Sequence, residues 1–154
     1  MNLLISEILD KVEAAKTKEE KLNLLKQYNT PLLRTIMRLN FDPDFNMDLP
    51  EGEPPYKKEP DKPIGMTETN LQKEFRRFYI WLTPQDLPRM RKEALFIQLL
   101  EGIHQSEADI LVLAKDKKLH KKYKSLTEKL IREAYPITLP AKKEERKAET
   151  PPLV

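Results

Sequence analysis

Two histidines, His104 and His120, limit the chemistry open to this chain of 154 residues. Glu101 and His104 form a Glu-x-x-His pair, the spacing with which di-iron bundles direct two ligands at a metal from one helical turn. Such a site needs two pairs and two further carboxylates, and this chain has one pair. Because cysteine is absent as well, the sequence predicts no metal site and no cofactor.

Nucleophilic catalysis has one candidate grouping, in which Ser106 lies close in sequence to His104 and Asp109. Ser106 also precedes an apolar helical pattern, a position where a serine hydroxyl caps the first free N–H groups of a helix. The three glycines are too scattered to build a phosphate-cradling loop. We therefore expect that the protein is not an enzyme.

Residues 115–124, KDKKLHKKYK, form the strongest local signal and are called the basic cluster below. Leu119 and Tyr123 are four residues apart and can anchor one helical turn to the core. We expect the lysines from Lys117 onward to project outward as a surface suited to phosphates or to an acidic partner. The alternative is a solvated charged corner. The candidate binding residues are Lys115, Lys117, Lys118, His120, Lys121, Lys122 and Lys124.

A secondary candidate lies where Arg76 and Arg77 alternate with aromatic residues between Phe75 and Trp81. Aromatic rings beside arginines can form a platform on which nucleic-acid bases stack. More often such rings belong to the core and the arginines lie at its rim. We favour the core interpretation.

The composition narrows the class of protein. A net charge of +3 is far below that of a chain built mainly to coat nucleic acid. No apolar run approaches the roughly 18 residues of a membrane span, and the N-terminus lacks the pattern of a signal peptide. Without cysteine, disulfides are excluded. These features predict a cytosolic protein.

The apolar pattern is helical wherever it is periodic, so we predict an all-α fold, an orthogonal array of about seven short helices. The helix at 88–101 is expected to be nearly fully buried and to be closed by Gly102 in the left-handed conformation. The stretch 91–136, which contains it, should be the part against which the rest packs. The first three predicted helices are one at 3–15, a second capped by Thr17 and a third begun by Thr30 and Pro31. The fourth is opened by Thr69 with Gln72 and continues to about 82, and the fifth is the helix at 88–101. The sixth is capped by Ser106, and the seventh is opened by Ser125 with Glu128.

The segment 41–66 contains six prolines and is called the proline-rich segment below. Proline fixes the backbone and lacks an N–H donor, so neither a helix nor a central strand can run through it. It is either a docking strap for a partner or a crossover between helical layers, and we favour the crossover. We predict one helical domain over 1–136 and a flexible tail over 137–154.

Four stretches carry a resemblance: LRTIMRLNFDPDF, DLPEGEPPYK, LFIQLLEGIH and AKDKKLHKKYKSLT. In this order, across roughly Leu22–Tyr135, the chain resembles an uncharacterised family of small proteins encoded by T4-like tailed phages, notably those that infect marine cyanobacteria. The resemblance implies no catalytic residues. It implies a phage protein that acts in the cytoplasm of an infected bacterium or is packed in the virion.

Together these features predict a non-enzymatic binding or adaptor module for a phage or host protein. The alternative is a nucleic-acid-binding accessory protein that uses the basic cluster. A structural virion component is a further alternative. No membrane partner is expected, and the oligomeric state stays open.

Overall fold

The computed structural model describes residues 3–136 and 138–139. Within them it contains eight α-helices, two 3₁₀ turns and no β-strand, so the predicted all-α class is confirmed. The elements in chain order are α1 (Ile5–Ala14), α2 (Lys18–Gln27), α3 (Pro31–Phe41), α4 (Leu71–Glu74), η1 (Phe75–Arg77), α5 (Tyr79–Leu82), α6 (Arg89–Gly102), α7 (Gln105–Lys115), η2 (Leu119–Lys121) and α8 (Glu128–Ala134).

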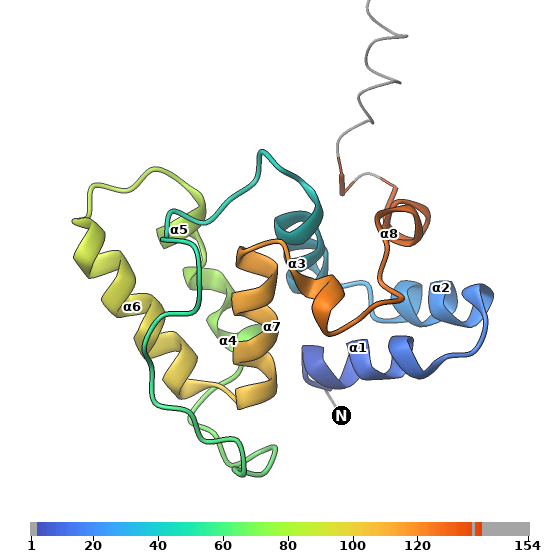
Figure 1. Cartoon of the computed structure of the whole chain (residues 1–154), viewed down its shortest axis with the longest axis horizontal. Helices are drawn as coiled ribbons and strands as arrows, with labels where there is room; N and C mark the ends of the chain where they lie inside the picture. The colour runs from blue at the N-terminus through green and yellow to red at the C-terminus, as the bar shows by residue number, and fades with distance from the viewer. Residues whose placement is uncertain (1–2, 137, 140–154) are drawn as a thin grey trace, which may run out of the picture.

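Two helical hairpins frame the molecule (Figure 1). Helices α1 and α2 form one pair, and α6 and α7 form the other, which runs across the direction of the first. Helix α3 packs against α7, and α8 covers α2. The proline-rich segment passes along the face of the α6–α7 pair on its way from α3 to α4 (Figure 1).

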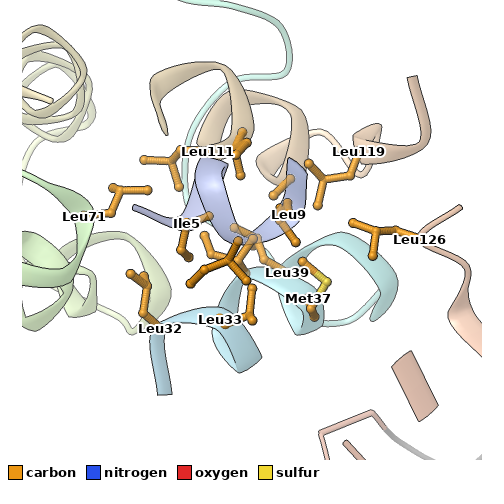
Figure 2. Packing of buried hydrophobic residues seen from close by; sticks show 14 of the residues in the cluster. Ile5, Leu9, Leu32, Leu33, Met37, Leu39, Leu71, Leu111, Leu119 and Leu126 are labelled. Carbon is orange, nitrogen blue, oxygen red and sulfur yellow. The ribbon is translucent and has the colours of Figure 1, made fainter. Parts of the chain in front are cut away.

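Helix α7 is the most buried element, and the core forms around it. Ile110, Leu111 and Ala114 have no exposed surface, and they meet apolar residues of α1 and α3 (Figure 2). Leu99 of α6 is also buried. However, α6 is buried on one face only, since Ala94 is exposed. The prediction of a nearly fully buried helix at 88–101 is therefore wrong.

The two predicted threonine caps are confirmed, whereas three other predicted starts are wrong. Thr17 accepts the Glu20 N–H at 3.1 Å, and Thr30 accepts the Leu33 N–H at 3.2 Å. The observed caps of α4, α7 and α8 are the side chains of Asn70, His104 and Thr127, rather than Thr69, Ser106 and Ser125.

Each residue wrongly predicted to cap is hydrogen-bonded elsewhere in the fold. The Ser125 hydroxyl donates to Glu13 of α1 at 2.5 Å. Ser106 Oγ lies 2.8 Å from Ser6 Oγ, and Thr69 Oγ1 lies 3.2 Å from a Glu74 oxygen. For the two serines, partners far away in the sequence therefore displaced the local capping preference, whereas Thr69 bonds within its own segment.

The single helix predicted from Thr69 to about 82 is wrong, because the 3₁₀ turn η1 separates α4 from α5. A 3₁₀ turn has three residues per turn, which places Phe75, Phe78 and Trp81 on one side. Phe75 and Phe78 pack edge to face at 5.3 Å between ring centroids, Phe78 and Trp81 at 6.2 Å, and Trp81 and Phe96 at 5.6 Å. The break in the helix thus aligns an aromatic row with the core.

Gly102 is the last residue of α6 and does not adopt the left-handed conformation predicted for it. Its role is steric. A Cβ atom at this position would lie 3.3 Å from Thr69 Cγ2, and the Gly102 carbonyl accepts the Thr69 N–H at 3.0 Å. Glycine therefore allows Thr69, two residues before α4, to approach the end of α6.

Glu107, in the first turn of α7, is buried and joins three helices. One carboxylate oxygen accepts the N–H of Leu71, the first residue of α4, at 3.1 Å. The other accepts the N–H of Ile5, the first residue of α1, at 3.4 Å. Burial raises the pKa of Glu107 above its usual range, although both N–H groups oppose that effect.

This geometry predicts a pH dependence of folding. Because the pKa of Glu107 is higher in the folded than in the unfolded chain, the folded state binds the proton more tightly. The contribution of Glu107 to the free energy of unfolding should therefore be fully present below about pH 4.5 and fall as the pH rises above that value. Urea denaturation of the wild type and Glu107→Gln from below to above this pH should show the wild type losing stability relative to the variant.

Glu133→Gln is the matched control. Its ion pair with Lys18 at 2.9 Å lowers the pKa of Glu133, so its contribution should rise with pH, the opposite sign. A stability difference between wild type and Glu107→Gln that is flat or rises with pH would contradict the assigned role of Glu107.

Candidate functional site

The basic cluster forms only part of the outward surface that the sequence predicts. Leu119 and Tyr123 are buried anchors, as expected. However, the ammonium groups of Lys115 and Lys117 both turn toward the proline-rich segment, so the prediction that Lys117 projects outward is wrong. Their long side chains let charges at the end of α7 reach backbone carbonyls of other elements.

Lys117 closes both α7 and α3. It has a φ of 61°, and the N–H groups of Lys117 and Lys118 bond to the carbonyls of Ala114 and Leu113 at 3.0 and 2.7 Å, which is a Schellman motif. Its ammonium donates to the carbonyls of Leu39 at 2.7 Å, Asp42 at 2.8 Å and Phe45 at 3.0 Å. A cation at a helix C-terminus is favourable, and here it satisfies carbonyls at the end of α3.

Lys115 holds the next part of the proline-rich segment. Its ammonium donates to the carbonyls of Pro50 at 2.8 Å and Gly52 at 3.0 Å, and it pairs with Asp116 at 2.6 Å. Asp116 in turn accepts the Gly52 N–H at 3.1 Å. The side chain of Lys115 is 3% exposed, so this lysine is no longer available to an external ligand.

The other members of the basic cluster lie at the surface. Lys118 is 3.8 Å from Glu51, and Lys122 is 4.0 Å from Asp109, which are long ion pairs. His120, Lys121 and Lys124 are exposed. Binding of phosphate or an acidic partner by these residues stays a prediction, with fewer free charges than the sequence suggested.

The secondary candidates, Arg76 and Arg77, lie beside aromatic rings of which one, Tyr79, is exposed. Phe78 and Trp81 are buried, and Arg77 pairs with Glu74 at 3.0 Å. Arg76 is exposed. Because the row of Phe75, Phe78 and Trp81 packs toward the core, this geometry favours the core interpretation.

The proline-rich segment is fastened along its length as it crosses from α3 to α4. Phe41 belongs to α3, and the crossing begins at Asp42. Asp48 accepts from the Lys92 ammonium at 2.7 Å, which lowers the pKa of Asp48. Further along, the Lys57 N–H donates to Glu101 at 2.7 Å, and the Lys62 carbonyl lies 2.8 Å from His104 Nε2. The second half of the segment is thus exposed but tethered.

A cleft of about 380 Å³ lies between this segment, α6 and the end of α7. It is called the strap cleft below. Its walls are mainly apolar, and three glutamates lie around them. The lining residues are Leu49, Pro50, Glu51, Gly52, Glu53, Pro54, Pro55, Glu93, Phe96, Ile97 and Lys115.

The carboxylates of the strap cleft differ in how free they are. Glu53 pairs with Lys58 at 2.6 Å, and Glu51 is 3.8 Å from Lys118. Glu93, on α6, makes no ion pair within the described residues, and it is half-buried. Lys115, the one cation among the lining residues, is neutralised by Asp116. Glu93 is therefore the charged group of the strap cleft that is most available to a ligand.

The residues considered for catalysis have structural contacts. His104 Nδ1 lies 2.7 Å from Ser106 Oγ and accepts the Ser106 N–H, while Nε2 donates to the Lys62 carbonyl. Glu101 accepts the Lys57 N–H. Across residues 3–136 and 138–139, no group of three or more histidine, aspartate or glutamate side chains could hold a metal ion.

Two further sequence predictions concern the C-terminal tail and membrane-spanning helices. Of the predicted tail, Thr138 and Leu139 are described, and Leu139 is buried; the rest lies outside the described residues. No described helix is long and apolar enough to cross a membrane.

A family model described as "Family of unknown function (DUF6433)" matches residues 8–121. The chain belongs to DUF6433. The match includes every residue that lines the strap cleft and ends within the basic cluster. No curated protein and no solved structure matches the chain. The phage origin implied by the resemblance stays a prediction.

The inward-turned side chain of Lys117 in this DUF6433 chain predicts how substitutions at that position should change the free energy of unfolding. Lys117→Ala should lower the free energy of unfolding by about 1.5 to 3 kcal/mol, because partly buried carbonyls lose a charged donor. Lys117→Gly should cost about 1 kcal/mol less than alanine, since glycine adopts the left-handed conformation without strain.

Lys121→Ala, at an exposed position of the same cluster, should change stability by less than about 0.5 kcal/mol. Urea unfolding of the three variants measures all of these values. Equal effects of alanine at positions 117 and 121 would show that the Lys117 contacts do not stabilise the fold.

Proposed function

We propose that this DUF6433 chain is a non-enzymatic binding module whose strap cleft accepts a partner-protein segment that carries both apolar and basic side chains. The observation that carries the proposal is the strap cleft itself, an apolar space of about 380 Å³ bordered by carboxylates. A concave, mainly apolar site with few polar groups is the usual form of a binding pocket.

The walls of the strap cleft define the chemistry of the ligand. Pro54, Pro55 and Ile97 offer apolar surface for an aliphatic side chain or the stem of a lysine or arginine. The charged head of such a side chain would reach Glu93 and form a charge-assisted hydrogen bond. An acidic or phosphorylated segment would be repelled by the same carboxylate.

The fastening of the proline-rich segment supports the proposal energetically. The Lys115 ammonium binds the carbonyls of Pro50 and Gly52, and Asp48 of the segment pairs with Lys92 of α6. A wall that is already ordered loses little conformational entropy when a ligand binds. The strap cleft is therefore preorganised, and its binding should need no large rearrangement.

The resemblance to T4-like phage proteins supplies the context for this proposal. We infer a phage or host protein as the partner, met in the cytoplasm of the infected bacterium. A structural role in the virion is the alternative in which the partner is another virion protein. The nucleic-acid alternative is less supported, because Lys115 and Lys117 donate to the chain's own carbonyls.

A peptide-display selection on the full-length chain tests the proposed function. Selected peptides should combine apolar residues with lysine or arginine. Their affinity for the Glu93→Lys variant should be about tenfold or more weaker, because this variant replaces the carboxylate by a positive charge that repels the basic side chain of the peptide. Isothermal titration of synthetic peptides measures the change.

Glu19→Lys is the matched control, because it makes the same charge change at an exposed position of α2, at the opposite end of the molecule from α6 (Figure 1). Binding should persist in this variant. Equal loss in both variants would show that only net charge matters, and selected peptides without basic residues would contradict the proposed ligand chemistry.

A further inference from the structure

We propose that the outer face of α3 holds a second site, for the phosphate group of a small phosphomonoester or for inorganic phosphate. The site is a shallow pocket of about 260 Å³, and it is independent of the strap cleft. Two arginines and two threonines supply its donors, and its lining residues are Pro31, Arg34, Thr35, Arg38, Phe45 and Thr138.

Arg38 is oriented by two contacts before any ligand arrives. Its Nε donates to Asp42 at 3.3 Å, and its guanidinium carbon lies 4.1 Å from the centroid of the Phe45 ring. These contacts fix the plane of the guanidinium, whose two terminal NH₂ groups make no other hydrogen bond within the described residues. The side chain is 49% exposed, so its donors are accessible.

Arg34 lies one helical turn from Arg38 and on the same face. One terminal nitrogen donates to Asn29 Oδ1, which is a neutral partner, and no ion pair neutralises Arg34 within the described residues. Tyr135 supplies no counter-charge, because burial raises the pKa of its phenol. Arg34 therefore keeps its positive charge available to an anion.

The charge balance of the pocket favours an anionic ligand, because Arg34 has no carboxylate partner within the described residues. Of the described residues, Asp42 pairs with Arg38 alone, and the side chain of Asp42 is 5% exposed. It also accepts the Asp44 N–H, and the Lys117 ammonium binds its main-chain carbonyl. Guanidinium groups present a fork of donors that matches phosphate oxygens, and Thr35 in the lining of the same pocket carries a further hydroxyl donor.

The size of the pocket favours a small phosphate over a nucleic acid. Nucleic-acid binding uses a row of phosphate contacts. Lys117, whose ammonium lies at the end of α3, is committed to main-chain carbonyls of α3 and the proline-rich segment. The pocket therefore offers one strong phosphate position.

Titration of the full chain with inorganic phosphate, followed by ¹H–¹⁵N NMR, tests the proposal, with chloride at equal ionic strength as the baseline. The amides of Arg34, Thr35 and Arg38 should shift and saturate. O-phosphoserine should shift the same amides. Arg34→Gln should weaken binding about tenfold or more. Within the described residues the Arg34 side chain hydrogen-bonds to the exposed end of one neighbour, Asn29, so this variant should still fold.

Arg91→Gln removes the same charge from an exposed position of α6 and should leave phosphate binding unchanged. No saturable shift in α3 up to about 50 mM phosphate, or equal weakening in both variants, would overturn the proposal. A single-stranded DNA 12-mer is the third arm. If the DNA bound through Arg34 more than tenfold tighter than phosphate, the small-ligand assignment would be overturned in favour of nucleic acid.

Discussion

Charged side chains at the two ends of α7 complete the hydrogen bonding of the elements around it. Helix ends leave backbone groups without intrahelical partners, and burial makes each unpaired group costly. Glu107 accepts N–H groups at the starts of α1 and α4, while Lys115 and Lys117 donate to carbonyls of α3 and the proline-rich segment. Within the described residues, no buried side-chain nitrogen or oxygen lacks a partner.

This constraint explains a residue that breaks a local rule. Position 117 follows the C-terminus of α7 in the left-handed conformation, where glycine is the usual choice. Lysine at this position is strained in its backbone conformation, but glycine has no ammonium group that could donate to the three carbonyls. The side-chain requirement of α3 has therefore overridden the backbone preference of α7. Burial lowers the pKa of Lys117, and nearby Asp42 and Asp44 oppose that shift.

The sequence predicts what depends on neighbours along the chain and fails where distant residues decide. Apolar periodicity identified the helices other than the one predicted across α4 and α5, and Thr30 with Pro31 marked the start of α3 correctly. Ser125 has the local signature of a cap, but it bonds to Glu13, far away in the sequence. Likewise, a run of lysines looks the same whether it faces water or a buried carbonyl. The strap cleft combines three separate stretches of chain, so no single motif encodes it.

The way in which the proline-rich segment is fastened explains why the strap cleft remains open. If apolar contacts alone held the segment, it would pack onto Phe96 and Ile97 until the space closed, because each additional van der Waals contact is favourable. Hydrogen bonds from Lys115 are instead directional and fixed in length, and Pro54 and Pro55 have no N–H with which to pair closer to α6. A polar clamp thus holds an apolar wall at a distance. The stability given up by leaving that surface unpacked is the free energy that a bound partner segment would recover.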